Sequence, residues 1–124
     1  MPSKNISVLI ADDHRLFAEA LEAILASEPG IEVVGRARTG EEAVEQALSL
    51  EPDVILMDIA MPGLDGVEAT RQIRRKQRSA CVLMLTGSNA RTDVARARDA
   101  GAAAYVTKDR IAAHLIDAIR ELAA

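Results

Sequence analysis

The sequence predicts an α/β fold in which a doubly wound sheet of five parallel strands is covered by helices on both faces. Short apolar runs alternate with longer segments whose apolar residues recur at helical spacing, and this alternation occurs five times. No repeat, linker or low-complexity segment interrupts it. The 124 residues, 49% of them hydrophobic, suffice for one domain with one sizeable core. Such alternation favours parallel strands joined by right-handed crossovers.

The first half of the chain contains three predicted strands and two helices. Residues 7–11 (SVLIA) are a continuous apolar run, typical of a strand buried on both faces. From His14, helical spacing continues to the break at 29–30 and predicts the first helix. Residues 31–37 are predicted as the second strand, and TGEE at 39–42 opens a helix that Pro52 closes. The third strand is predicted at 54–57.

The second half of the chain continues the pattern with three helices and two strands. Residues 67–75 and 92–100 have helical spacing, and the apolar run at 82–85 between them predicts the fourth strand. The fifth strand is predicted at 102–106, after Gly101. The last helix is indicated by an apolar stripe of Ile111, Leu115, Ile119 and Leu122.

Composition excludes several classes of function. A net charge of −4 argues against nucleic-acid binding by this chain, and only Phe17 and Tyr105 are aromatic, so base-stacking platforms are absent. The single cysteine, Cys81, excludes an internal disulfide and multi-cysteine zinc sites. The sequence has neither a signal-peptide core nor an apolar run of membrane-spanning length. We therefore expect a soluble cytoplasmic domain without a membrane partner.

Polar side chains follow four of the five predicted strands. Asp12 and Asp13 come after the first strand, Asp58 after the third, Thr86 after the fourth, and Lys108 shortly after the fifth. In an open parallel sheet, ligands bind beyond the carboxyl ends of the strands, where the winding direction reverses. We therefore expect these side chains to meet at one edge of the sheet.

The chemistry of this set favours a Mg²⁺-assisted phosphoryl site. Three neighbouring carboxylates repel one another unless they take up protons or bind a hard cation, and a shallow rim suits Mg²⁺ better than Ca²⁺. One aspartate could act as a nucleophile, while Lys108 and Thr86 contact phosphoryl oxygens. Taken singly, the pair Asp12-Asp13 is more typical of a helix N-cap, and Asp58 of an Asx turn. Their joint position favours the functional interpretation.

With these residues in place, the sequence resembles the response-regulator receiver domain, the CheY-like phospho-accepting module of two-component signalling. The resemblance covers essentially the whole chain, residues 1–124. It rests on ADDHRLF around the acid pair, MDIAMPGLDG around Asp58, LTG with Thr86, and YVTKD with Tyr105 and Lys108. It implies a (βα)5 flavodoxin-like fold with strand order 2-1-3-4-5.

The resemblance also implies roles for the residues of the predicted site. Asp58 would accept a phosphoryl group from a sensor histidine kinase or a small phosphodonor. Asp13 and Asp58 would bind Mg²⁺ directly, Asp12 largely through water, and the backbone carbonyl of Ala60 would complete the protein ligands. The domain would catalyse its own phosphorylation and dephosphorylation, without being an enzyme that turns over a separate substrate.

A second group of implied roles concerns the response to phosphorylation. Thr86 and Lys108 would contact phosphoryl oxygens, and Thr86 and Tyr105 would act as a switch pair. Phosphorylation would then remodel the surface formed by the fourth helix, the fifth strand and the last helix, and could drive homodimerisation. The fourth helix has little beyond Val94 and alanines to bury, which makes it easier to shift.

The residue after the lysine refines the resemblance. Many receivers have proline there, whereas Lys108 is followed by Asp109, and together with ADDHRLF this is similar to NarL/FixJ-type regulators. Such regulators usually carry a downstream helix-turn-helix output domain that controls transcription, and none follows in this chain, which ends at Ala124. We expect a receiver excised from a longer transcription factor, with a stand-alone receiver as the alternative, and DNA contact only through the missing domain.

Two other functions remain as alternatives. A haloacid-dehalogenase-like phosphatase also uses a strand-end aspartate with Mg²⁺, but the position of its usual general acid is Ala60 here. A pseudo-receiver would bind partners without phosphorylation, although all the expected acids, Thr86 and Lys108 are present. We expect His14 and His114 to be surface residues, and Asp65 to be a turn or cap residue before the third helix.

Overall fold

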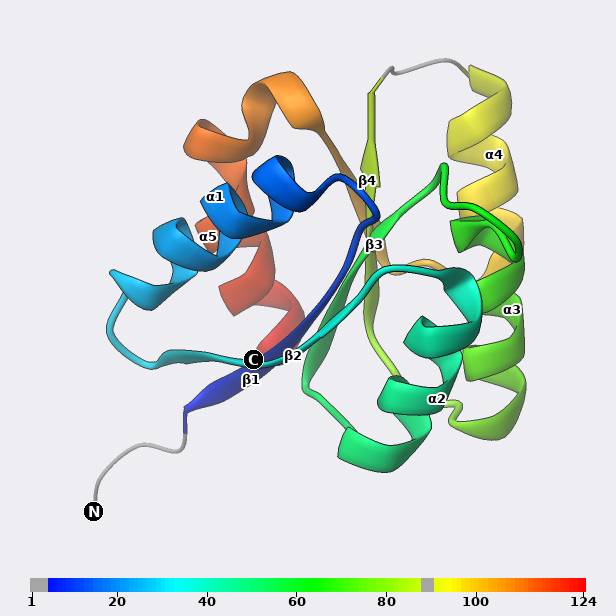
Figure 1. Cartoon of the computed structure of the whole chain (residues 1–124), viewed down its shortest axis with the longest axis horizontal. Helices are drawn as coiled ribbons and strands as arrows, with labels where there is room; N and C mark the ends of the chain where they lie inside the picture. The colour runs from blue at the N-terminus through cyan, green and yellow to red at the C-terminus, as the bar shows by residue number, and fades with distance from the viewer. Residues whose placement is uncertain (1–4, 88–90) are drawn as a thin grey trace.

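Five parallel strands form one sheet in the order β2-β1-β3-β4-β5, which confirms the predicted fold class and strand order (Figure 1). The computed structural model describes residues 5–87 and 91–124. The strands are β1 (Ile6–Ala11), β2 (Ile31–Ala37), β3 (Val54–Asp58), β4 (Val82–Thr86) and β5 (Ala104–Thr107).

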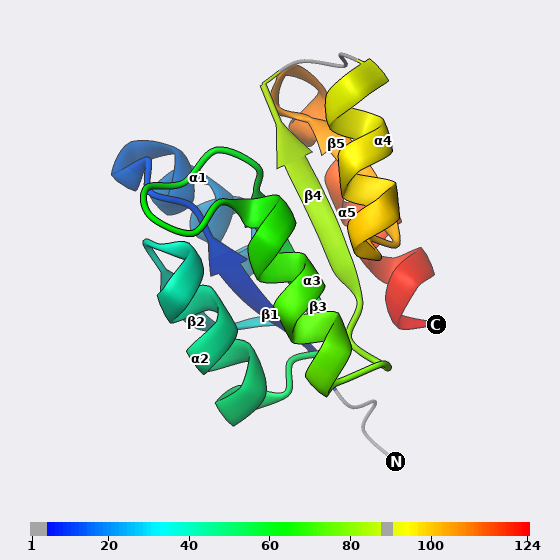
Figure 2. The same ribbon diagram turned by 90° about the vertical axis from the view of Figure 1, so that its right-hand side faces the viewer.

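Helices cover both faces of the sheet. Helices α1 and α5 lie on one face, and α2, α3 and α4 lie on the other, as Figures 1 and 2 show. Their bounds are α1 (Arg15–Ala26), α2 (Gly40–Leu50), α3 (Gly66–Lys76), α4 (Arg91–Ala100) and α5 (Ile111–Ala123). Within the described part of the chain, none of the helices has the length and apolar character needed to cross a membrane.

The core consists of two apolar layers, one on each side of the sheet. Alternate residues of a strand enter opposite layers: Leu83 and Leu85 pack with α1 and α5, whereas Met84 packs with α2, α3 and α4. Every residue of β3 and β4 is buried. Burial on both faces explains why these strands are continuous apolar runs in the sequence.

The observed ends of β3 and β4 differ from the predicted ones, and both differences concern residues of the predicted site. Strands β3 and β4 each extend one residue further than predicted, so that Asp58 and Thr86 are their last residues. Both residues still pair with neighbouring strands, Asp58 with Leu85 and Thr86 with Thr107. Their backbone is therefore held by the sheet, and the side chains stand at its edge.

Strand β5 lies two residues later than predicted at its start. Gly101 adopts φ +103°, and its N–H and that of Ala102 donate to the carbonyls of Arg98 and Ala97. These two bonds form the Schellman cap that ends α4, so Ala102 belongs to the cap rather than to the strand. After β5, a short 3₁₀ helix (Lys108–Arg110) precedes α5 and was not predicted.

Candidate functional site

The ends of β1 and β3 place two aspartates side by side. Ala11 is the last residue of β1 and pairs with Met57, so Asp12 lies beside Asp58 at the same edge. The N–H of Asp12 donates to the carbonyl of Ala37 at 3.0 Å, which continues the pairing with β2. Both aspartates are only 3% exposed. The predicted convergence of these acids is confirmed.

Asp12 and Asp13 do not cap helix α1, so the capping interpretation of this pair is wrong. The N-cap position is occupied by His14, whose side chain makes no capping hydrogen bond. Instead, Oδ1 of Asp12 accepts a hydrogen bond from the backbone N–H of His14 at 2.8 Å. This bond fixes the turn from strand to helix and leaves the Asp12 carboxylate facing the site.

The loop after Asp58 is held by the core and by the start of α3. Met61 is buried, and Gly63 adopts φ +72°, a conformation that favours glycine after Pro62 in a tight turn. Asp65 is the N-cap of α3, as predicted, and accepts from the N–H of Glu68 at 2.9 Å. The chain therefore leaves the sheet directly after Asp58, and α3 begins eight residues later, at Gly66.

Gly66 explains why the third helix starts so close to the aspartate. A Cβ added at Gly66 would lie 2.0 Å from the carbonyl oxygen of Asp58 and 3.0 Å from Cα of Ile59. Only glycine allows the first turn of α3 to pack against this backbone. The N–H of Gly66 also donates to the carbonyl of Ile59 at 3.0 Å. The backbone beneath the Asp58 carboxylate is thus braced by α3.

Lys108 reaches the acids from the 3₁₀ helix after β5. Its Nζ lies 3.2 Å from Oδ2 of Asp12 and 3.5 Å from Oδ2 of Asp58. The same ammonium group lies 4.3 Å from the centre of the Phe17 ring on α1. A cation over an aromatic face gains electrostatic attraction from the ring quadrupole, so Phe17 helps to hold Lys108 over the acids.

Two buried carboxylate oxygens of the site are short of hydrogen bonds. Oδ2 of Asp12 and Oδ2 of Asp58 lack a hydrogen-bond partner among the described residues, although Lys108 lies within ion-pair distance of both. Burial, and then the charge of Asp12, raise the pKa of Asp58 above its ordinary value, while Lys108 and the N–H of Ala60 act in the opposite direction. The site favours an added positive charge.

A fourth potential ligand, which we did not expect from the sequence, lies within the acid cluster. Four ligand atoms lie within 4.8 Å of one another, one from each of Asp12, Asp13, His14 and Asp58. His14 is a surface residue, as predicted, but its Nδ1 turns toward all three acids. The signal in the sequence was its place directly after the acid pair, at the strand-to-helix turn.

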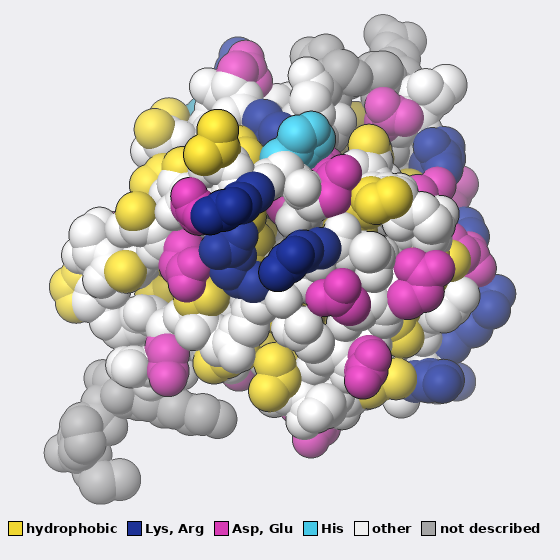
Figure 3. All heavy atoms as spheres, in the orientation of Figure 1, with side chains coloured by type: hydrophobic (Ala, Val, Ile, Leu, Met, Phe, Trp, Pro, Cys, Tyr) yellow, Lys and Arg dark blue, Asp and Glu magenta, His cyan; other side chains and the backbone are white. Residues whose placement is uncertain are grey.

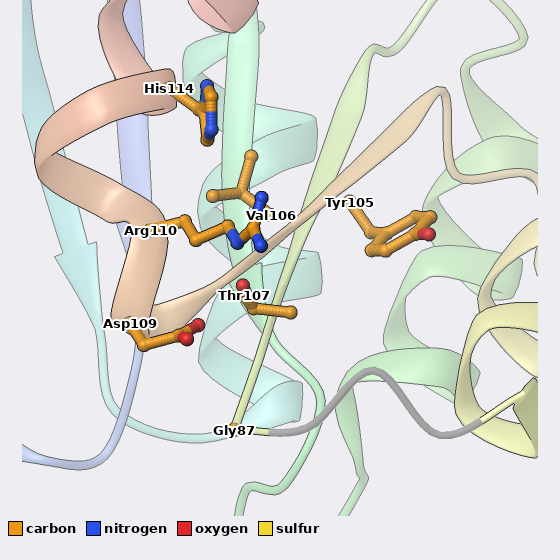
Figure 4. Close-up of a pocket in the computed structure, with 7 residues that line it drawn as sticks. All are labelled: Gly87, Tyr105, Val106, Thr107, Asp109, Arg110 and His114. Atoms are coloured by element: carbon orange, nitrogen blue, oxygen red, sulfur yellow. The ribbon is translucent and has the colours of Figure 1, made fainter.

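Thr86 and Tyr105 lie on the same face of the sheet, in neighbouring strands. Thr86 pairs with Thr107, and Tyr105 pairs with Met84, so the two side chains are diagonal neighbours on the face covered by α4. Thr86 is buried, whereas Tyr105 is 45% exposed. Tyr105 borders a hollow of 740 Å³ beside α5, where it points away from Arg110 and His114 (Figure 4).

Cationic side chains lie on the other side of the acids as well. A second hollow, of 520 Å³, is lined by Asp12, Asp13 and Glu19 together with Arg15, Arg36 and Arg38. Arg15 is ion-paired with Glu19, and Arg36 with Glu22. Figure 3 shows Lys and Arg side chains gathered near the middle of the face that is turned to the viewer in Figure 1, with Asp and Glu side chains around them. The acid cluster is thus bordered by positive charge, although the chain as a whole is acidic.

Comparisons with known proteins agree with this geometry. Residues 8–120 match the family described as response regulator receiver domain. The response regulator UvrY of Escherichia coli (strain K12) is 40% identical over 117 residues, which are 94% of this chain and 54% of that protein. This chain thus spans about half the length of the curated relatives it matches.

Solved structures of receivers have the same fold. The signal receiver domain of the response regulator NarL from Mycobacterium tuberculosis is 30% identical, with a TM-score of 0.93 over 98% of both chains. A chain of the CheX-CheY-BeF₃-Mg²⁺ complex from Borrelia burgdorferi is 26% identical, with a TM-score of 0.83 over 93% of this chain and 90% of that one. On the strength of the match over residues 8–120 and the likeness to UvrY, this chain belongs to the response regulator receiver domain family of two-component systems.

Proposed function

We propose that this receiver accepts a phosphoryl group on Asp58 from a sensor histidine kinase or a small phosphodonor, in a reaction that depends on Mg²⁺. The observation that carries the proposal is the environment of the Asp58 carboxylate. It stands at the end of a fully buried strand, with an Oδ2 that lacks a hydrogen bond and with Lys108 3.5 Å away. A rigidly held carboxylate beside a fixed cation suits attack on phosphorus.

The residues present fit a divalent cation. Two buried carboxylate oxygens lack a hydrogen bond, although Lys108 lies within ion-pair distance of both. With the ligand atoms of the acid cluster they form an oxygen-rich site of the kind that Mg²⁺ prefers. Asp13 and Asp58 would hold the ion directly, Asp12 through water, and the Ala60 carbonyl would complete the set. Bound Mg²⁺ would supply charge neutralisation for the phosphoryl oxygens. The likeness to a chain of the CheX-CheY-BeF₃-Mg²⁺ complex from Borrelia burgdorferi supports this assignment.

The residues of the chain then have separate tasks in the transfer. Asp58 attacks phosphorus with a carboxylate oxygen, so that a P–O bond forms while the bond from phosphorus to the donor nitrogen or oxygen breaks. Lys108 and Thr86 contact phosphoryl oxygens and disperse their charge. The arginines around the second hollow, two of which are also ion-paired with glutamates, add positive charge on the approach of an anionic donor. Hydrolysis of the same acyl phosphate by water completes the dephosphorylation that the domain itself catalyses.

The switch uses the face of the sheet that carries Thr86 and Tyr105. Phosphorylation adds charge and acceptor oxygens at Asp58, and Thr86 moves toward them. Tyr105 then turns inward from its exposed position, and the surface of α4, β5 and α5 changes with it. Helix α4 is suited to such a shift because Ala97 and Ala100 are its buried residues among those whose side chains are described.

The proposal extends to the output of the domain and to its location. We propose that the domain works in the cytoplasm and controls transcription through a DNA-binding domain of the longer protein, since this chain spans 54% of the UvrY relative. DNA contact would then belong to that other domain, in keeping with the net charge of −4 here. A phosphorylation-linked homodimer is a natural way for the remodelled surface to act on the output.

Incubation with acetyl phosphate, followed by intact-protein mass spectrometry, tests the proposal. The wild-type chain should gain the mass of one phosphoryl group with Mg²⁺ present and much less with a chelator. Asp58→Asn should gain none, because an amide is a poor nucleophile, and Asp13→Ala should lower incorporation and weaken Mg²⁺ binding. Asp117→Asn, which changes an exposed acid on α5, is the matched control. Full incorporation into Asp58→Asn would overturn the assignment.

A further inference from the structure

His14 brings a nitrogen donor to the acid cluster. Its Nδ1 lies 3.2 Å from Oδ1 of Asp12, 3.4 Å from Oδ1 of Asp13 and 3.7 Å from Oδ2 of Asp58. The imidazole comes from the N-cap of α1, so its backbone is fixed by the hydrogen bond from its N–H to Asp12. The ring nitrogen therefore faces the three carboxylates and is within hydrogen-bond distance of Asp12. It can bind a metal in the neutral tautomer that carries its proton on Nε2.

A second observation shows that this point favours a cation. The acids include two fully buried oxygens, Oδ2 of Asp12 and Oδ2 of Asp58, that lack a hydrogen-bond partner among the described residues. Lys108 lies within ion-pair distance of both, but its single positive charge does not balance the three carboxylates of the cluster. Their residues are each 3% exposed, so water reaches these carboxylates poorly. The His14 side chain, by contrast, is 63% exposed and can adjust toward an ion without disturbing the core.

The mixed donor set changes which ion the site prefers. Mg²⁺ prefers oxygen ligands and gains little from an imidazole, whereas divalent transition metals bind imidazole well and follow a general order of rising affinity from Mn²⁺ to Cu²⁺. We propose that His14 is a metal ligand, and that the site binds a divalent transition-metal ion more tightly than it binds Mg²⁺. The inference concerns the site of the proposed phosphoryl transfer but does not require that transfer to occur.

Histidine 14 and histidine 114 form a matched pair for the test. His114 lies on α5 beside Arg110 and Val106, at the first hollow and outside the acid cluster (Figure 4). His14→Phe keeps a planar ring but removes the nitrogen donor, and His14→Ala removes the ring. His114→Ala removes the other histidine of the chain. Far-UV circular dichroism checks that each variant is folded.

Mn²⁺ is the probe, because its electron spin reports directly on a bound nitrogen. Electron spin-echo envelope modulation should show ¹⁴N coupling from imidazole in the wild-type chain and in His114→Ala, and should lose it in both His14 variants. Calorimetric titration should show Mn²⁺ binding more tightly than Mg²⁺. Removal of the ligand should weaken Mn²⁺ binding about tenfold or more and change Mg²⁺ binding little.

Two results would overturn the inference. One is the absence of ¹⁴N coupling in the wild-type chain, or its persistence in the His14 variants. The other is an equal loss of Mn²⁺ and Mg²⁺ affinity when His14 is changed. Neither result bears on phosphorylation of Asp58, which is measured separately with Mg²⁺, so failure of the inference and failure of the proposed function are distinguishable.

Discussion

Replacing Asp58 with asparagine should stabilise the metal-free protein. In that state the Asp58 carboxylate is buried, repelled by Asp12 and attracted by Lys108. At an effective dielectric constant of about 20, a pair of unit charges about 4 Å apart interacts by about 4 kcal/mol, so the repulsion and the attraction largely cancel. The cost of burying a charged oxygen that lacks a hydrogen bond remains. Asp58→Asn removes that charge and should raise the free energy of unfolding by about 1 to 3 kcal/mol at neutral pH.

The pH dependence of this difference has a definite sign. The pKa of Asp58 is raised above 3.8, so the folded state binds the proton more tightly than the unfolded state. The stability that protonation contributes is present below pH 3.8 and is lost as pH rises through the raised folded pKa. Asparagine stays neutral throughout. Its advantage over aspartate should therefore be near zero at low pH and grow as pH rises.

Urea unfolding in a chelating buffer, followed by far-UV circular dichroism, measures this difference. Asp117→Asn, at an exposed position on α5, should change the free energy of unfolding little at any pH. Added Mg²⁺ should stabilise the wild-type chain more than Asp58→Asn and so narrow the gap, because the ion binds the folded state. An asparagine variant that is less stable than the wild-type chain at neutral pH, or a stability difference independent of pH, would show that the buried Asp58 charge does not destabilise the fold.

Three further substitutions test the switch, a helix cap and the support of the lysine. Thr86→Ala should keep phosphoryl incorporation but abolish the phosphorylation-dependent change in hydrogen exchange of α4 and β5; equal loss of both would contradict the switch role. Asp65→Ala should lower the free energy of unfolding by about 1 kcal/mol through loss of the bond from the Glu68 N–H, whereas Asp65→Asn should restore most of it. Phe17→Leu should slow incorporation about fivefold, the effect of losing about 1 kcal/mol of cation–π attraction to Lys108, without unfolding the chain; an unchanged rate would remove Phe17 from the account.

Much of the fold could be predicted because the strands are buried on both faces. Continuous apolar runs such as VILM before Asp58 are typical of strands buried on both faces, which leaves few other assignments of secondary structure. Parallel strands must bring their carboxyl ends to one edge of the sheet. The convergence of Asp12, Asp58 and Lys108 follows from that topology alone. The start of β5 could not be predicted, because the glycine cap of α4 takes up residues whose alanine-rich sequence is equally compatible with a strand.

The contacts that depend on the direction of a side chain could not be predicted from the sequence. His14 was predicted to be an ordinary surface residue because its partners are assembled by two strands and one turn. The position of Phe17 beneath Lys108 depends on the 3₁₀ helix after β5, which was not predicted. Asp65, by contrast, was correctly predicted as a turn or cap residue, since N-caps depend on local sequence.

The residue that carries the phosphoryl group can be mapped by chemical reduction and mass spectrometry. The chain is treated with acetyl phosphate and Mg²⁺, the acyl phosphate is reduced with borohydride, and the digested peptides are sequenced by mass spectrometry. Reduction converts an aspartyl phosphate to homoserine, which marks the acceptor permanently. We expect homoserine at Asp58 and unmodified aspartate at Asp12 and Asp13. Homoserine at another aspartate, or none after treatment, would contradict this expectation.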